Sequence, residues 1–332
     1  MKRILVTGGS GFIGTNVVES YLASGHEVLS IDIKEPQKRE HHKVFKRVDI
    51  LDKRSLEGIF KDFVPTHVLH LAARADLHEK KNLEGYAVNI KGVENMVRAI
   101  SAQPSVVRCI FTSTKLVCAT DYVPKSMDDY CPNTLYGESK VMGEKIVKDN
   151  TTMRCDWCIV RPTSIWGPWS DSAHIPYGKF FRMIARGRYF HPGHADPPKS
   201  FGYVGNGMFQ IEKLFDAPTE QIHRKIFYLT DYDTFTIREW ADMISMKLRN
   251  KKIRAIPEWM VSILAVVGDL MKFCGIKEPL FSSFRLQNMR ANTAKIPTEA
   301  IRQITGPLPY SMEQGVEETI AWFKKYGKNY IS

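Results

Sequence analysis

The sequence predicts an α/β fold of the Rossmann type, a doubly wound parallel sheet followed by a smaller C-terminal α/β substrate lobe. Apolar β-branched runs alternate with amphipathic helical segments as far as about residue 170, and a glycine-rich turn follows the first run directly. The chain has 332 residues of which 43% are hydrophobic, enough for two lobes at ~100–200 residues per domain. We expect a cofactor domain at residues 1–170 and a substrate lobe at residues 171–332, with some exchange of chain between them.

The N-terminal segment has the pattern of a strand, a turn, a helix and a second strand. Thr7 to Gly14 follows the apolar run, with glycines at Gly8, Gly11 and Gly14. In such a motif the first glycine permits a tight turn, the second lets the backbone approach a pyrophosphate, and the third packs the helix against the sheet. The phosphate lies on free N–H groups where the helix begins, here near Phe12 and Ile13. This pattern predicts dinucleotide binding.

An acid ends the second predicted strand, Glu27 to Asp32. Asp32 stands eighteen residues after Gly14, and its carboxylate can accept hydrogen bonds from both ribose hydroxyls. A 2′-phosphate there would meet a like charge, so NAD is favoured over NADP. Lys34, Lys38 and Arg39 follow closely enough to keep NADP as the alternative.

Strands and helices then alternate along the chain. Further strands are predicted at Val44–Ile50, His67–Ala73, Val106–Thr114 and Cys158–Pro162, and helices at Arg54–Asp62, Leu83–Gln103 and Leu135–Lys148. In open parallel sheets ligands bind beyond the carboxyl ends of the strands. We therefore expect the functional residues at that edge.

A second group of candidate site residues is expected at the same edge of the sheet. The predicted strand at Val106–Thr114 ends in Thr112-Ser113-Thr114, and Tyr136 and Lys140 follow on a helix. Residues four apart share one helix face. A neighbouring ammonium favours the phenolate of a tyrosine whose pKa is ordinarily about 10. Tyr136 can then exchange a proton with a substrate oxygen that Thr114 holds, while NAD carries the hydride.

The charge composition limits the kinds of partner that the protein is expected to bind. The net charge of +11, from 47 basic and 36 acidic residues, suits an anionic ligand or surface. The basic residues are spread along the chain, and no helix-turn-helix, zinc-finger or basic-zipper pattern is found. Nucleic acid is therefore not an expected partner.

A core strand is predicted directly at the start of the sequence, so we expect no cleavable signal. Its longest apolar run, Trp259 to Met271, is shorter than the ~20 residues that span a bilayer. Six cysteines give no disulfide framework, so we expect a reduced, cytoplasmic protein. Cys155 and Cys158 match a redox or zinc pair in spacing, but in a strand residues three apart point to opposite faces. We predict no metal site.

These motifs resemble the extended short-chain dehydrogenases/reductases, particularly the NAD-dependent epimerase/dehydratase family that acts on nucleotide sugars. The resemblance covers most of the chain and is most specific in the first 170 residues. It implies hydride chemistry at a sugar carbon, with Tyr136, Lys140 and Thr114 as the catalytic set. It also implies cofactor contacts at the glycine turn and at Phe12, Ile13, Asp32, Ile33, Asp49, Ile50, Leu71, Ala72, Ala73, Asn89, Thr112, Tyr136, Lys140, Pro162 and Thr163.

The chain departs from the family after the catalytic threonine. Sugar 4,6-dehydratases have an Asp-Glu pair there, whereas this chain has Lys115 and Leu116. Elimination of water needs a base at one carbon and an acid at the next. Dehydration is therefore disfavoured, while epimerisation, ketoreduction or alcohol oxidation need only the Tyr, Lys and Thr set.

The C-terminal half offers candidates for the substrate. Lys199 lies where family members place a basic residue near the phosphates, and Arg285 and Arg290 precede a segment similar to the family's Asp-x-x-Lys region. The arginines are either a diphosphate clamp or solvated surface residues. The apolar segment Pro257–Phe273, which follows Lys251, Lys252 and Arg254, resembles a helix that hydroxysteroid dehydrogenases use near membranes. We expect it to pack within the lobe, with weak membrane association as the alternative.

Three functions remain open at this point. The first is an NAD-dependent nucleotide-sugar epimerase or 4-keto reductase acting on a nucleotide diphosphate sugar. The second is a hydroxysteroid-type or other apolar alcohol dehydrogenase. The third is an NAD-binding sensor or scaffold, against which the intact Tyr136, Lys140 and Thr114 argue. The resemblance also implies a homodimer formed through Leu83–Gln103 and Leu135–Lys148.

Overall fold

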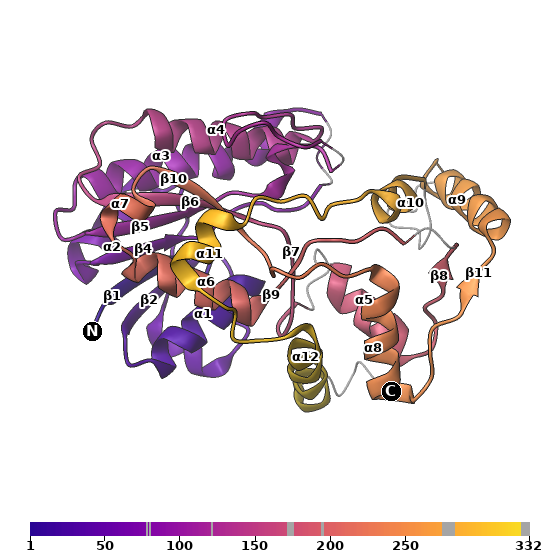
Figure 1. Cartoon of the computed structure of the whole chain (residues 1–332). Coiled ribbons are helices and arrows are strands. Elements are labelled where there is room, and N and C mark those ends of the chain that lie inside the picture. The colour runs from indigo at the N-terminus through magenta and orange to yellow at the C-terminus, as the bar shows by residue number, and fades with distance from the viewer. Residues whose placement is uncertain are drawn as a thin grey trace.

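A seven-stranded parallel sheet forms the centre of the molecule (Figure 1). The computed structural model describes residues 1–326 except 78, 80, 121, 171–175, 194–195 and 274–282. The order of the strands is β3-β2-β1-β4-β5-β6-β10, with the chain reversing its direction of travel at β1 and β4. This order is that of a Rossmann fold, as predicted. The strands are β1 (Arg3–Thr7), β2 (Glu27–Asp32), β3 (Phe45–Arg47), β4 (His67–His70), β5 (Arg108–Thr112), β6 (Asp156–Pro162) and β10 (Lys225–Leu229).

Helices cover both faces of this sheet. One face packs on α2 (Lys53–Phe63), α3 (Ala87–Ser101) and α4 (Leu135–Asp149), and the other on α1 (Phe12–Ala23), α6 (Val204–Asp216), α7 (Thr219–Ile222) and α11 (Glu299–Thr305). Because strand residues alternate in direction, every strand except the edge strand β3 contributes to both cores. Cys155 and Cys158 illustrate the alternation: they are buried in opposite cores, which confirms that they do not form a pair.

The chain crosses between two halves after residue 170. β10, α6 and α11 return to the large sheet. Five further elements surround the buried Trp240 in a third core: β7 (Ser164–Trp166), α5 (Pro176–Ala185), β9 (Phe201–Tyr203), α8 (Ile237–Arg249) and α12 (Met312–Tyr326). The predicted capping box of α8 is present, with Thr236 and Glu239 exchanging hydrogen bonds. Two short strands, β8 (His191–Pro192) and β11 (Ala255–Ile256), pair further out.

Some predicted elements differ in length from those observed. The third strand is only β3, because a 3₁₀ turn occupies residues 39–44 and the chain turns again at Asp49. The fourth strand ends at His70 rather than Ala73. The predicted helix Leu83–Gln103 begins as the 3₁₀ turn η2 (Leu83–Tyr86) before α3. None of these changes moves a predicted site residue away from the carboxyl edge of the sheet.

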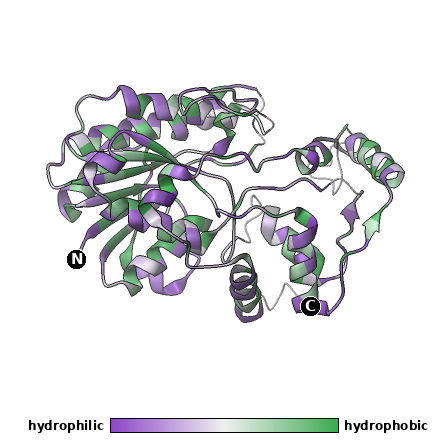
Figure 2. Ribbon diagram, in the orientation of Figure 1, coloured by the Kyte–Doolittle hydropathy of each residue, from purple (hydrophilic) through white to green (hydrophobic). Residues whose placement is uncertain are grey.

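The expectation that the apolar segment near residue 260 packs within the lobe is wrong for most of its side chains. The segment forms α9 (Glu258–Phe273), on which α10 (Ser283–Arg290) packs. Val261 and Ala265 are buried, but an apolar stripe faces solvent. The hydropathy colouring in Figure 2 shows many apolar residues along α9. We define this α9 stripe as Trp259, Ile263, Val266, Leu270 and Phe273, which are 56–90% exposed.

Within the described part of the chain, no helix has the length and apolarity needed to cross a bilayer. The same residues include no group of three or more His, Cys, Asp or Glu side chains placed to hold a metal ion. The five described cysteines carry free thiols, and Cys274 lies outside the described residues.

Candidate active site

The glycine turn between β1 and α1 forms a backbone cradle. Gly8 has a φ of +73°, and a Cβ atom there would lie 2.7 Å from the backbone nitrogen of Ala72. A Cβ atom at Gly14 would lie 2.2 Å from the carbonyl oxygen of Gly8. Only glycine fits either position. No side chain caps the N-terminus of α1 at Gly11, so its first N–H groups are free for an anion. The cradle fits a dinucleotide pyrophosphate.

Asp32 is held at the edge of this cradle. Its carboxylate accepts hydrogen bonds from the backbone N–H groups of Ser10 and Lys34, at 3.1 and 3.0 Å. A carboxylate has about four acceptor positions, so two remain for ribose hydroxyls. Ile33 is exposed beside it. The geometry agrees with the predicted preference for NAD.

The remaining predicted cofactor positions lie along the adjoining strand ends. Asp49 is exposed, whereas Ile50 is buried against Gly92 of α3. The backbone N–H groups of Leu71 and Ala72 donate to the carbonyl and hydroxyl oxygens of Thr7, which fixes residues 71–73 beside the cradle.

Asn89 joins three segments of the site. Its side-chain oxygen accepts from the N–H of Arg74 at 2.8 Å, and its amide nitrogen donates to the carbonyl of Arg74 and to the hydroxyl of Ser139. Ser139 in turn donates to the carbonyl of Tyr136. Asn89 is 1% exposed, and both its amide hydrogens are used. It therefore positions the loop after β4 relative to α4.

Tyr136 and Lys140 lie on the inner face of α4. The helix begins where Thr134 accepts a hydrogen bond from the N–H of Gly137 at 3.0 Å. The hydroxyl of Tyr136 shares a hydrogen bond with the side chain of Thr114. The ammonium of Lys140 donates to the carbonyl of Thr112 at 2.6 Å. The structure thus brings together the three residues predicted to be catalytic, at the carboxyl end of β5.

Burial sets the protonation of this pair. Desolvation raises the pKa of Tyr136 to about 12, although the hydrogen bond with Thr114 opposes the rise. Desolvation also lowers the pKa of Lys140 to about 8, while Glu144 opposes that change. The expected lowering of the tyrosine pKa by Lys140 is not found in the structure, where Thr114 opposes the rise that burial and Tyr86 cause. Tyr136 is a phenol at neutral pH, ready to donate a proton.

The strand end at β6 closes the other side of the site. β6 ends at Pro162, and the backbone N–H and the hydroxyl of Thr163 both donate to the carbonyl of Leu229 on β10. Residues 162 and 163 are therefore fixed between the sheet and β7.

The substrate candidates are less closely grouped. Lys199 is 4% exposed, and its ammonium donates to the carbonyl of Ala291. The guanidinium of Arg290 is directed instead to Glu258 of α9, with both side chains half-exposed. Arg285 belongs to α10, but its side chain lies outside the described part of the structure. Of the two candidates whose side chains the structure describes, Lys199 is the one buried beside the segment at residues 291–297.

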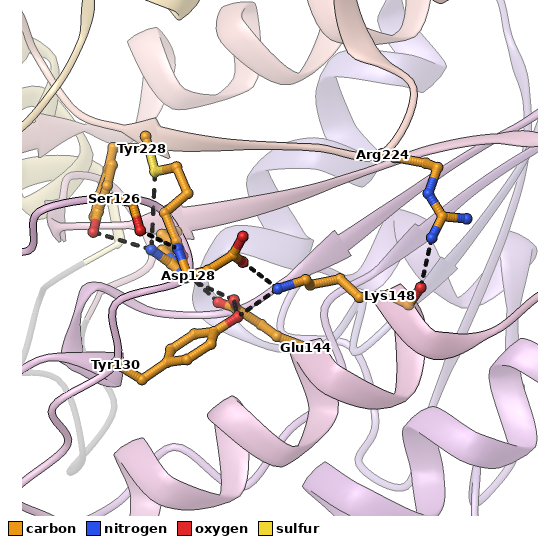
Figure 3. A network of polar contacts seen from close by, with 9 residues as sticks. Ser126, Asp128, Tyr130, Glu144, Lys148, Arg224 and Tyr228 are labelled. Atoms are coloured by element: carbon orange, nitrogen blue, oxygen red, sulfur yellow. Dashed lines mark hydrogen bonds and ion pairs between the residues drawn. The ribbon is translucent and has the colours of Figure 1, made fainter.

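A buried ion pair that the sequence reading did not identify supports α4. Glu144 accepts from the guanidinium of Arg161 on β6 through both its oxygens, at 2.8 and 2.7 Å (Figure 3). Tyr130 donates to the same carboxylate at 2.9 Å, and Tyr228 accepts from Arg161 at 3.3 Å. The spacing places Glu144 on the helix face of Tyr136 and Lys140, because the three recur every four residues, but it does not reveal Arg161 as the partner.

Comparison with known proteins agrees with this geometry. Residues 4–210 match the NAD dependent epimerase/dehydratase family, and the chain belongs to that family. It is 26% identical to a 3-beta-hydroxysteroid dehydrogenase of Mycolicibacterium neoaurum, over 97% of this chain and 92% of the relative. It is 24% identical to N-acetyl-alpha-D-glucosaminyl-diphospho-ditrans,octacis-undecaprenol 4-epimerase of Escherichia coli, over 96% and 95%. The fold matches the UDP-glucose 4-epimerase of Thermotoga maritima with UDP-glucose at a TM-score of 0.77 and 20% identity, covering 98% and 99%.

Proposed function

We propose that the protein is an NAD-dependent nucleotide-sugar epimerase or 4-keto reductase. The observation that carries this proposal is the hydrogen bond between Thr114 and Tyr136, with Lys140 one turn along α4 and the glycine cradle in the same domain. Bound NAD supplies reversible hydride transfer. Thr114 would orient the substrate oxygen, Tyr136 would exchange its proton, and Lys140 would hold the nicotinamide ribose.

An anionic sugar substrate is supported by charge. Lys115 and Lys199 are enclosed lysines that lie close enough for Lys199 to lower the pKa of Lys115, and burial lowers the pKa of each to about 8. The undecaprenol-diphosphate epimerase of Escherichia coli and the UDP-glucose epimerase of Thermotoga maritima act on or bind diphosphate-linked sugars by their names. The absence of the Asp-Glu pair, replaced by Lys115 and Leu116, disfavours 4,6-dehydration.

Thermal stabilisation of the NAD-loaded protein tests this proposal. The panel is UDP-, GDP-, CDP- and dTDP-sugars, with a sterol and a plain alcohol alongside. A ligand at 100 times its dissociation constant stabilises by about 2.7 kcal/mol. We expect one nucleotide diphosphate sugar to raise the melting temperature. A response to the sterol or the alcohol alone would contradict the proposal.

The α9 stripe favours a second candidate, an apolar alcohol dehydrogenase of the hydroxysteroid type. Its five side chains recur at intervals of three or four residues and so form one continuous face of α9. Exposed Lys251, Lys252 and Arg254 precede the helix, and Trp259 stands at its first turn. α9 lies at the far end of the C-terminal lobe from the sheet (Figure 1). An apolar face with basic residues and tryptophan suits the surface of an anionic bilayer, from which a lipid-linked or sterol substrate would be taken.

We expect the wild-type protein to float with vesicles that contain phosphatidylglycerol, and to bind phosphatidylcholine vesicles less. The double variant Ile263→Glu/Leu270→Glu should lower vesicle binding at least about tenfold, because it places two charges in the apolar face. Both positions are more than half exposed, so folding should be retained. Val107→Glu is the matched control, since Val107 is 56% exposed on the large domain. Equal binding by the double variant, or no binding by the wild type, would contradict a membrane role for α9.

The proposal also covers the oligomeric state of the protein and its location in the cell. α3 and α4 pack side by side on one face of the sheet, and we propose that a homodimer forms through these helices. We place the protein in the cytoplasm, consistent with the free thiols of the five cysteines that the structure describes.

A further inference from the structure

Lys115 is the residue that follows the threonine of the proposed catalytic set. The strand β5 ends at Thr112, and a 3₁₀ turn (Lys115–Val117) begins after Thr114, whose hydroxyl accepts a hydrogen bond from the N–H of Leu116 at 3.2 Å. The same threonine side chain contacts the hydroxyl of Tyr136. Lys115 therefore lies at the same carboxyl end of β5 as Thr114 and the oxygen that Thr114 would hold.

Lys115 is a largely enclosed cation without a counter-ion. Desolvation, together with the nearby ammonium of Lys199, lowers its pKa to about 8. No carboxylate among the described residues forms an ion pair with Lys115, in contrast to Arg161, whose buried charge is matched by Glu144. Burying an unmatched charge is unfavourable. Such a residue indicates a site whose anion is supplied from outside the chain.

Lys199 approaches from the other half of the molecule. It precedes β9 and is 4% exposed, and its ammonium is held by the carbonyl of Ala291. The two ammonium groups lie close enough for Lys199 to lower the pKa of Lys115, and an anion that binds between them relieves their mutual repulsion. Lys115 also lines a cavity of about 50 Å³ together with Tyr228, Thr293 and Lys295, which is room for one small group.

We propose that Lys115 and Lys199 form a subsite for a carboxylate carried by the substrate next to the reacting carbon. This inference rests on the proposed nucleotide-sugar function and narrows it to sugar acids of the hexuronate class. In a hexuronate oxidised at C4, the carboxylate is attached to the adjacent carbon, whereas the diphosphate at C1 lies across the ring. A subsite one residue from Thr114 is therefore closer to the position of the carboxylate than to that of the diphosphate.

The subsite is tested by comparing the binding of two ligands that differ only in the carboxylate. Calorimetry on the NAD-loaded protein compares UDP-glucuronate with UDP-glucose, or the corresponding pair with the nucleotide that the panel selects. We expect the uronate to bind at least about tenfold more tightly, because a charge-assisted hydrogen bond contributes that order of affinity. Lys115→Met should remove this preference while changing the affinity for the neutral sugar less than about threefold. Lys115→Arg should keep most of it, and Lys91→Met is the control for an exposed lysine.

Equal binding of the two sugars by the wild type would overturn the subsite and leave the proposed function standing. Equal losses for both sugars in Lys115→Met would also overturn it, because Lys115 would then only position Thr114. If no nucleotide sugar binds, the proposed function fails separately. In that case the binding of free glucuronate is compared with that of free glucose. Glucuronate binding that is lost in Lys115→Met supports the subsite. Equal binding of the two sugars overturns the subsite.

Discussion

Replacing Tyr136 by phenylalanine is expected to lower kcat by about 10²- to 10⁴-fold, the usual contribution of a positioned general acid or base. The ring is 9% exposed and packs 6.1 Å from the ring of Tyr86, so its position should not change when the hydroxyl is removed. Thr114 then keeps its place at the end of β5, but no phenol remains to exchange a proton with the substrate oxygen. Steady-state kinetics on the substrate identified by the panel, together with NADH binding followed by fluorescence, measure the effect.

Tyr86→Phe is the matched control for this variant. Tyr86 lies beside Tyr136, but its hydroxyl donates to the carbonyl of Asp76 at 2.6 Å and takes no part in the contact with Thr114. We expect Tyr86→Phe to change kcat less than about tenfold, because it removes only a positioning hydrogen bond. Cofactor affinity should stay within about twofold in both variants, since neither touches the glycine cradle. Full turnover by Tyr136→Phe would remove Tyr136 from its proposed role.

The sheet could be predicted from the sequence because its signals are local. A buried parallel strand appears as a short apolar run, and the turn at Gly8 to Gly14 can be built by few other residues. The capping box at Thr236 likewise needs only a pair three residues apart. The predicted lengths of short elements such as β3 were wrong. Tertiary contacts, and not the propensity of the residues, decide where a short edge strand ends.

The sequence could predict site residues only where all the residues of a motif lie in one helix, strand or turn. Tyr136 and Lys140 share a helix, so their relation is local. The pairing of Glu144 with Arg161, and of Lys115 with Lys199, joins segments 17 and 84 residues apart, which no periodicity reveals. The pKa of Tyr136 was misjudged for the same reason: burial depends on the whole fold, whereas the neighbouring lysine is visible in the sequence. The exposure of α9 is also a tertiary property, because an apolar helix has the same pattern whether or not another element covers it.

Glu144→Gln is expected to destabilise the protein by about 3–5 kcal/mol, the usual cost of leaving one partner of a buried ion pair without its counter-charge. The side chain of Arg161 is fully buried, and that of Glu144 is 2% exposed. Glutamine preserves the shape, but its NH₂ group would face a guanidinium N–H in place of an acceptor. Urea unfolding gives the change in free energy. Glu94→Gln is the control, because Glu94 forms an exposed pair with Lys91 and should change stability by less than about 0.5 kcal/mol.

A second variant separates the charge from the packing. Replacing both partners, as in Glu144→Leu/Arg161→Met, removes the unmatched charge and should recover at least half of the stability lost in Glu144→Gln, since apolar pairs replace buried ion pairs at little cost. Activity supplies an independent readout: Glu144 raises the pKa of Lys140, so Glu144→Gln should move the alkaline limb of the pH profile to lower pH. A loss no greater than that of Glu94→Gln, with an unshifted limb, would show that the pair neither stabilises α4 nor influences Lys140.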